Sequence, residues 1–430
     1  MSFPIFAYIA LLLLAALLST RLMRLIKLPN VTGYILTGII MGPFVFGLLF
    51  NNFTYEGIKE SVIYSHVDSI KWVSTIALGF IAFSIGTSFK ISTLKVVGKR
   101  VIIITILEAL LASVFVILAL VGAHFIAPNH VSWELVLTLG AIASATAPAA
   151  TLMVIKQYNA KGPLVNTLLP VVALDDAAAL ILFAILFQIA LALAGGNFSL
   201  YSMLFKPLIE IAISLAVGLV IGFLISLMNR WFKSRNNRLI WTIFAVFAAV
   251  GIYYLFKNPQ LGGFELSSLL MCMMAGAVYT NMCKDSGKTL DVYDRFTAPI
   301  YMMFFVISGA SLDLTIFFNG NGLLVVIVAL VYIIFRVVGK YLGAFAGACM
   351  THCEPQVKKY LGFTLVPQAG VAIGLATTAN YLFTANESTK EAGALVIAII
   401  LTTTLVYELI GPLVSKFALT KAGEIKQEAR

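Results

Sequence analysis

The sequence predicts an all-α polytopic membrane protein with thirteen transmembrane helices. Its 430 residues are 60% hydrophobic and only 11% charged, with a mean hydropathy of +0.99, a balance that excludes an ordinary soluble domain. Apolar runs of about 20 residues, long enough to span a bilayer core about 30 Å thick, recur from one end of the chain to the other. The basic residues fall mainly in alternate loops, as expected of a chain that crosses a membrane repeatedly.

The apolar runs and the polar turns between them define the expected spans. They lie at 3–20, 31–50, 70–88, 99–122, 131–156, 163–194, 203–228, 237–256, 264–282, 296–312, 322–350, 358–382 and 392–415. The first run has no basic region before it and no convincing cleavage site, so we expect a retained helix rather than a signal peptide.

The positions of the basic residues predict the orientation in the membrane. Most of the 29 lysines and arginines cluster at 21–27, 90–100, 156–161, 230–238, 284–295, 358–359 and 416–430. The intervening loops hold only Lys59, Lys71, Lys257 and Lys390. By the positive-inside rule the N-terminus is outside and the C-terminus is cytoplasmic. The net charge of +10 therefore reflects membrane orientation and not nucleic-acid binding.

Two spans contain matched interruptions. The fifth is broken around Pro148, and the twelfth contains Pro367, Gln368 and Gly370. A single proline in a membrane helix is often only a kink. These two breaks lie seven spans apart, which predicts two inverted six-helix repeats, spans 1–6 and 8–13, with span 7 as a linker. Inverted repeats with one broken helix each are typical of secondary transporters.

The sixth span carries Asp175 and Asp176 side by side among apolar residues. One charged side chain at the centre of a membrane helix costs roughly 2.5–3.5 kcal/mol, so two adjacent ones indicate a function. At about 1.5 Å per residue, Asp175 lies about 18 Å from the cytoplasmic end of its helix and Lys340 about 17 Å from the cytoplasmic end of the eleventh. Their equal depth predicts that the two residues pair.

Adjacent aspartates on a helix point about 100° apart, so one can pair with Lys340 while the other faces an aqueous cavity. A buried carboxylate without a partner holds either a proton or a hard cation but not both, and this competition is the minimal chemistry of a cation/proton antiporter. We expect the helix breaks to add backbone carbonyls, and Thr146 and Thr151 to add hydroxyls, as ligands for a cation such as Na⁺. A lysine that loses its proton when its partner changes would add a second proton to the cycle.

The other charges in the spans predict structural pairs. Arg336 lies one turn from Lys340, and Glu108 or Glu408 could neutralise it. The glycines at 339, 343 and 347 form a small-residue stripe, which predicts close packing of the eleventh helix against a neighbour.

Five stretches together resemble one known family. They are LPNVTGYILTGIIMGP at 28–43, ATAPAAT at 145–151, ALDDA at 173–177, FRVVGKYLGAFAG at 335–347 and LVPQAGVAIGLA at 365–376. The chain resembles the monovalent cation:proton antiporter superfamily, specifically its second branch, which includes bacterial sodium/proton and Kef-type potassium/proton exchangers. The resemblance implies an NhaA-like antiporter fold.

The resemblance also implies a homodimer in a prokaryotic cell membrane and an elevator-type movement of a core domain. The implied division is dimerisation helices at 1–95 and 237–320, core ion-transport helices at 96–200 and 321–418, a linker helix at 201–236 and a cytoplasmic tail at 419–430. Asp176 would be the main cation and proton ligand, and Asp175 the partner of Lys340. Two aspartates imply electrogenic exchange, and no cofactor or enzymatic activity is expected.

Two departures from the family's Kef-type members favour Na⁺ (or Li⁺) over K⁺. The third span reads Gly86-Thr87-Ser88 where those members often carry an acid, and too few residues follow the last span for a cytosolic nucleotide-binding domain. K⁺/H⁺ exchange remains the first alternative. A passive cation channel and an intramembrane aspartyl protease are remoter alternatives. The protease is disfavoured because adjacent aspartates diverge and cannot share the single water that such a protease needs.

Overall fold

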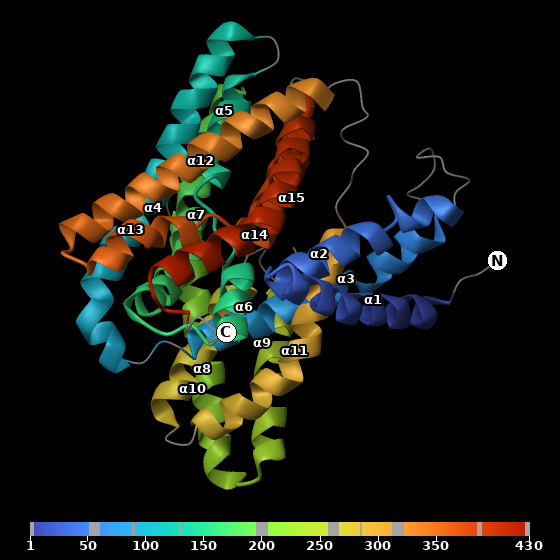
Figure 1. Ribbon diagram of the computed structural model, residues 1–430. Coiled ribbons are helices and arrows are strands. Elements are labelled where there is room, and N and C mark those ends of the chain that lie inside the picture. The colour runs from blue at the N-terminus through green and yellow to red at the C-terminus, as the bar shows by residue number, and fades with distance from the viewer. Residues whose placement is uncertain are drawn as a thin grey trace. The chain divides into compact units, whose positions relative to one another are not determined.

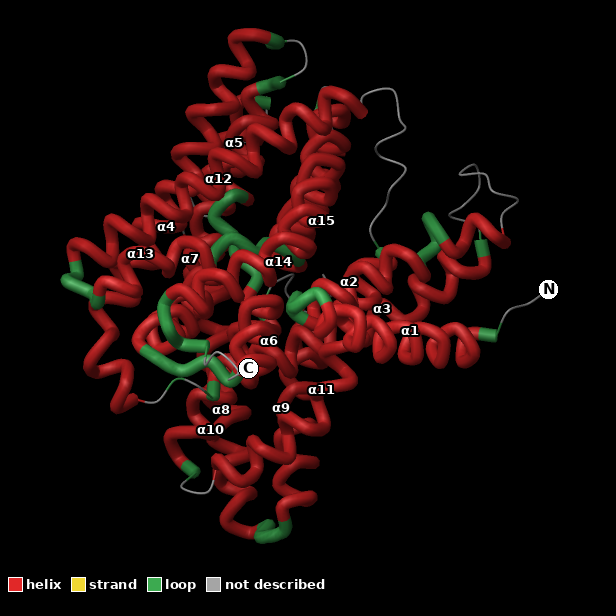
Figure 2. Tube along the Cα trace, in the orientation of Figure 1, coloured by secondary structure: helices red, strands yellow, loops and turns green. Residues whose placement is uncertain are grey.

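The computed structural model describes residues 4–50, 61–87, 89, 91–128, 131–194, 205–256, 266–283, 286–311, 322–384 and 389–425. Within these ranges the secondary structure is helical and no strand is present (Figure 2). Lys59, Ser88, Lys90, Lys257, Lys284 and the end of the 419–430 tail, all used in the sequence predictions, lie outside the described residues.

The chain divides into two compact units, and each is built from two separate stretches of sequence. Unit 1 comprises Met1–Val96 and Ile209–Leu312, and unit 2 comprises Val97–Leu208 and Asp313–Arg430. The residues predicted to form the ion site all belong to unit 2.

Unit 1 is built mainly from the first three α-helices, one 3₁₀ helix and four helices in the middle of the chain (Figure 1). They are α1 (Ile5–Leu25), α2 (Asn30–Met41), the 3₁₀ helix η1 (Phe46–Phe50), α3 (Val62–Gly86), α8 (Lys206–Trp231), α9 (Arg235–Phe256), α10 (Ser268–Met282) and α11 (Ser286–Ala310). Helix α2 packs on α1 and α11, and α3 packs on α9, α10 and α11.

Unit 2 holds the other eight helices. They are α4 (Ile91–Ile126), α5 (Trp133–Ile142), α6 (Pro148–Tyr158), α7 (Pro163–Leu193), α12 (Gly322–Met350), α13 (Pro355–Thr364), α14 (Gly370–Thr384) and α15 (Lys390–Lys421). Helix α12, orange in Figure 1, contacts α4 through its glycines and packs on α13 and α15.

Each expected span coincides with one helix or with two consecutive ones. The two spans predicted to be broken are the pairs α5–α6 and α13–α14. The span expected at 31–50 also divides, because α2 ends at Met41 and the Gly42–Pro43 step is followed by η1; a residue before proline disfavours the helical conformation. Among the described residues, nine helical stretches are long and apolar enough to cross a membrane, and α5 and α10 are shorter apolar helices. Thirteen crossings and inverted repeats stay predictions.

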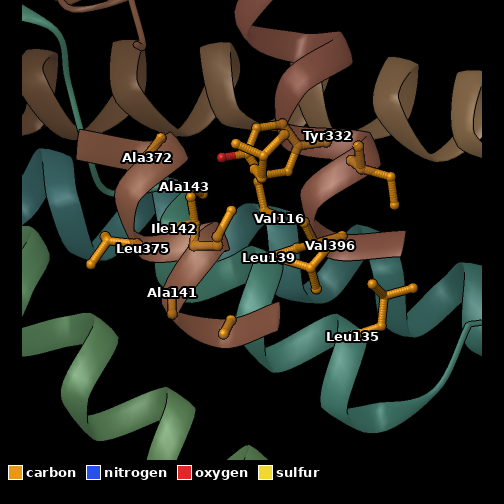
Figure 3. Packing of buried hydrophobic residues seen from close by; sticks show 14 of the residues in the cluster. Val116, Leu135, Leu139, Ala141, Ile142, Ala143, Tyr332, Ala372, Leu375 and Val396 are labelled. Carbon is orange, nitrogen blue, oxygen red and sulfur yellow. The ribbon is translucent and has the colours of Figure 1, made fainter. Parts of the chain in front are cut away.

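An apolar core surrounds the first helix break in unit 2. Figure 3 shows side chains of α5, such as Leu135 and Leu139, packed with Val116, Tyr332 and Val396 from three other helices. All five side chains are buried. This packing holds the end of α5 in place, and with it the start of the break at residue 143.

The chain after α15 folds back onto the start of α7. Gly423, with φ of 77°, makes the left-handed turn that ends α15. The Glu424 carboxylate then accepts hydrogen bonds from the backbone N–H groups of Leu164 (2.5 Å) and Val165 (2.9 Å). The N-cap of α7 is Gly162, whose missing side chain makes this approach possible, since a Cβ there would lie 2.4 Å from the Glu424 Cδ atom. Glu424 therefore serves as the N-terminal cap of the helix that carries both aspartates.

Replacing Glu424 with glutamine should flatten one part of the pH dependence of stability. Burial raises the pKa of the Glu424 carboxyl, and the two N–H donors lower it by less. Because the folded pKa exceeds the unfolded value of about 4.3, the contribution of Glu424 to stability is fully present below that value and is lost as the pH rises through the folded pKa. We expect the melting temperature of the wild type, relative to Glu424→Gln, to fall as the pH rises above the unfolded value of about 4.3.

This is measured by thermal unfolding in detergent micelles across the pH range. Glu391→Gln, an exposed change in the first turn of α15, is the matched control and should give a curve parallel to that of the wild type. A parallel curve for Glu424→Gln as well would contradict the prediction.

Candidate functional site

The two helix breaks of unit 2 meet in space. Residues 143–147 separate α5 from α6, and residues 365–369 separate α13 from α14. The backbone N–H of Ala147 donates to the carbonyl of Pro367 at 2.8 Å. Pro148 then starts α6 at a position where its missing N–H costs no hydrogen bond, and Gly370 starts α14. The two prolines that the sequence predicted as break markers thus lie at one junction.

Gln368 ties the second break to the first. Its side-chain nitrogen donates to the carbonyl of Ile142 at 3.0 Å and to that of Ala145 at 3.3 Å. The hydroxyl of Tyr332 on α12 donates to the Gln368 carbonyl oxygen at 3.2 Å. Since Gln368 is buried, these bonds satisfy an amide that would otherwise be costly at this depth.

Arg336 on α12 binds both breaks at once. Its guanidinium donates to the carbonyls of Ala143 (3.0 Å), Ala145 (2.6 Å) and Val366 (2.7 Å). The same group lies over the ring of Tyr407, 4.6 Å from its centroid. Arg336 is fully buried, and its fork of five donors suits several carbonyls in fixed positions.

Lys340, one turn further along α12, is shared by three elements. Its ammonium lies 2.5 Å from Glu108 Oε2 on α4 and 3.2 Å from Asp175 Oδ2 on α7. It also donates to the carbonyl of Ser144 in the first break. The side chains of all three charged residues are completely buried. The sequence predicted the contact with Asp175 from matched depth, but considered Glu108 only as one of two possible partners of Arg336.

Asp176 differs from Asp175 in its surroundings. It is 3% exposed, and within the described part of the chain its Oδ1 atom accepts no hydrogen bond. The hydroxyl of Thr146 in the first break is buried and unbonded in the same way. Carboxylate and hydroxyl oxygens are the ligands that hard cations prefer. Asp176 therefore offers a buried anionic oxygen that a proton or a hard cation can occupy.

Thr151 is placed differently from the expected ion-facing position. Its hydroxyl donates to the carbonyl of Thr364 at 3.2 Å and lies 3.2 Å from the hydroxyl of Ser415. These bonds link α6 to the end of α13 and to α15. Glu408, expected as a structural pair for Arg336, is buried on α15 beside Tyr407.

Several carbonyls of the breaks have partners within the protein, those of Ala143, Ser144, Ala145 and Val366 among them. Sequence reasoning assigned these oxygens to the cation. In the structure they accept hydrogen bonds from the side chains of Arg336, Lys340 and Gln368. Sequence reasoning therefore missed Ser144 and the part that Gln368 plays in joining the breaks. The glutamine in the second break was the available signal, because a polar side chain at membrane depth requires a partner.

The four cysteines are free, and within the described residues no group of three His, Cys, Asp or Glu side chains could hold a metal ion.

Three comparisons with known proteins bear on the family and the fold of this chain. The family model for the transmembrane sodium/hydrogen exchanger matches residues 9–416. A structure of the sodium proton antiporter MjNhaP1 from Methanocaldococcus jannaschii at pH 8 is similar with a TM-score of 0.67 and 19% identity, over 97% of this chain and 98% of that one. An electron-microscopy map of the same antiporter gives a TM-score of 0.72 and 19% identity over 98% and 99% of the two chains. At this identity the likeness shows a shared fold.

The chain is also 27% identical over 179 residues to the iron transporter MagA of Paramagnetospirillum magneticum. The match covers 41% of this chain and 36% of that relative. The alignment thus spans only about a third of the length of MagA.

Proposed function

Because the chain belongs to the sodium/hydrogen exchanger family, we propose that it is a secondary antiporter that exchanges Na⁺ (or Li⁺) for H⁺ across a membrane. The observation that carries this proposal is the buried oxygen of Asp176 without a hydrogen-bond partner, next to a residue already paired with Lys340. A proton and a cation would compete for that oxygen.

The family match confirms the predicted cation:proton antiporter superfamily and corrects the branch. The placement in the second branch, with the Kef-type exchangers, was slightly off. The matched model describes sodium/hydrogen exchangers, and the matched solved structures are of a sodium proton antiporter. These descriptions also favour Na⁺ over the K⁺ alternative. The family is one of transporters rather than enzymes.

In this proposal Asp176 binds the cation or the proton, and Asp175 is the partner of Lys340. Thr146 supplies a hydroxyl ligand. Arg336 and Gln368 hold the broken helices in place, because their side chains bind the break carbonyls. Exchange is electrogenic, since two buried aspartates allow more protons than cations to move in each cycle.

Unit 2 is the proposed moving core of an elevator-type cycle, and unit 1 the dimerisation domain of a homodimer. The confinement of the site residues to unit 2 supports this division. By the positive-inside rule the C-terminus is on the cytoplasmic side and the N-terminus outside. The proposed membrane is the prokaryotic cell membrane that the resemblance implies.

The deciding experiment uses proteoliposomes with a trapped pH-sensitive dye and an imposed pH gradient. Na⁺, Li⁺ and K⁺ are added in turn, with and without a clamped membrane potential. We expect Na⁺ and Li⁺, but not K⁺, to drive proton movement at a rate that depends on the potential.

The other outcomes separate the alternatives. A response to K⁺ alone would assign K⁺/H⁺ exchange. Cation flux that moves no protons and needs no pH gradient would assign a channel. If no cation moved protons in folded protein, the role proposed for the aspartates would be wrong.

A further inference from the structure

The glycine stripe on α12 brings α4 close enough for Glu108 to reach Lys340. A Cβ atom at Gly343 would lie 2.4 Å from the Cα of Glu108, and one at Gly347 would lie 2.8 Å from the Cα of Ile104. At Gly339 it would meet the backbone of α4 at 2.6 Å. Contacts this short are closed to any residue with a side chain, so the stripe sets the distance between the two helices. The closest approach falls at Glu108 itself.

Two carboxylates and one carbonyl surround the Lys340 ammonium. Its N–H groups donate to Asp175 and to the carbonyl of Ser144, and Glu108 adds an ion pair in which, among the described residues, its oxygens accept no hydrogen bond. The Glu108 contact, at 2.5 Å, is the shorter of the two ion pairs. A buried ammonium that loses its counter-ion is strongly destabilised. With two carboxylates in place, either can move away without leaving the charge alone.

We propose that Glu108 is a positioning residue of the exchange site: it anchors the Lys340 ammonium to α4, so that Asp175 can leave Lys340 during the cycle. The inference rests on the exchange proposed above. Without Glu108, Asp175 is the one carboxylate left on the ammonium and is held there. The group of charges around Lys340 also loses one of its two carboxylates.

Both effects weaken cation binding, so Glu108→Gln should raise the KM for Na⁺ by about tenfold. Glu108→Asp keeps the charge and should recover part of the lost affinity. If Glu108 only filled space, Glu108→Gln, which keeps the size of the side chain, would be the milder of the two changes. The matched control is Glu354→Gln, which breaks the half-exposed pair between Glu354 and Arg100 on α4 (3.6 Å) and should leave the KM unchanged.

The measurement is Na⁺-dependent proton flux in proteoliposomes, with the wild type in the same series. Absence of exchange by the wild type would refute the proposed function. Exchange by the wild type with a KM for Glu108→Gln equal to that of Glu354→Gln would refute only the anchoring role.

A second test needs no transport activity. Lys340→Ala leaves the carboxylates of Glu108 and Asp175 facing each other without a cation. Adding Glu108→Gln to Lys340→Ala removes one of them, so the double variant should melt several degrees above Lys340→Ala alone. A double variant that melts at or below the single one would overturn the pairing of Glu108 with Lys340.

Discussion

Asp176→Asn should abolish cation-dependent proton movement, with a fall in rate of about a hundredfold or more. The asparagine amide cannot bind and release a proton at physiological pH, and it offers a cation one neutral oxygen in place of an anionic one. Losing a charge-assisted contact of about 1.5–3 kcal/mol already lowers occupancy by about 10- to 150-fold. Losing the exchangeable proton removes the coupling as well. The dye assay with Na⁺ in proteoliposomes measures the result.

Folding should survive this change, which separates it from a structural lesion. The Oδ1 atom of Asp176 accepts no hydrogen bond among the described residues, so the variant gives up little that holds the fold together. We expect its melting temperature to equal or exceed that of the wild type. Asp291→Asn, an exposed change on α11, is the control for rate. Normal exchange by Asp176→Asn would remove Asp176 from the mechanism.

Lys340→Ala should have the largest effect on stability. It leaves the carboxylates of Glu108 and Asp175, both fully buried, without their cation. Removing one partner of a buried ion pair costs about 3–5 kcal/mol, and two carboxylates lose their cation here. Acidification should recover part of the loss, because protons can neutralise the stranded groups. Thermal unfolding in detergent at two pH values measures both effects.

Lys359→Ala provides the comparison, because Lys359 is an exposed lysine on α13 that lies over the ring of Tyr360. Its melting temperature should stay close to that of the wild type. An equally small change for Lys340→Ala would show that its ammonium does not neutralise these acids.

The helices and their interruptions were predictable because they depend on local sequence. Apolar runs gave the helical stretches, and Pro148 and Pro367 marked the breaks that the structure places together. The contact of Asp175 with Lys340 followed from one further assumption, that buried opposite charges at equal depth pair. Each of these steps needs only rise per residue and the cost of burying charge.

The remaining contacts depend on which helices touch. Arg336 and Lys340 are one turn apart, and sequence alone could not decide which of them Glu108 would meet. The glycines of α12 settle that question by fixing the closest approach to α4 at Glu108. Glu424 was missed for a related reason: it follows the last apolar run, and its partners on α7 lie about 260 positions earlier.

The cap on α7 affects how reporters can be attached to this protein. A fluorescent protein fused directly after Ala422 would remove Gly423, Glu424 and the buried Ile425, and would expose the start of the aspartate-bearing helix. A fusion placed after residue 430 leaves those contacts in the chain. The fusion after Ala422 should therefore give much lower fluorescence and monodispersity than the fusion after residue 430.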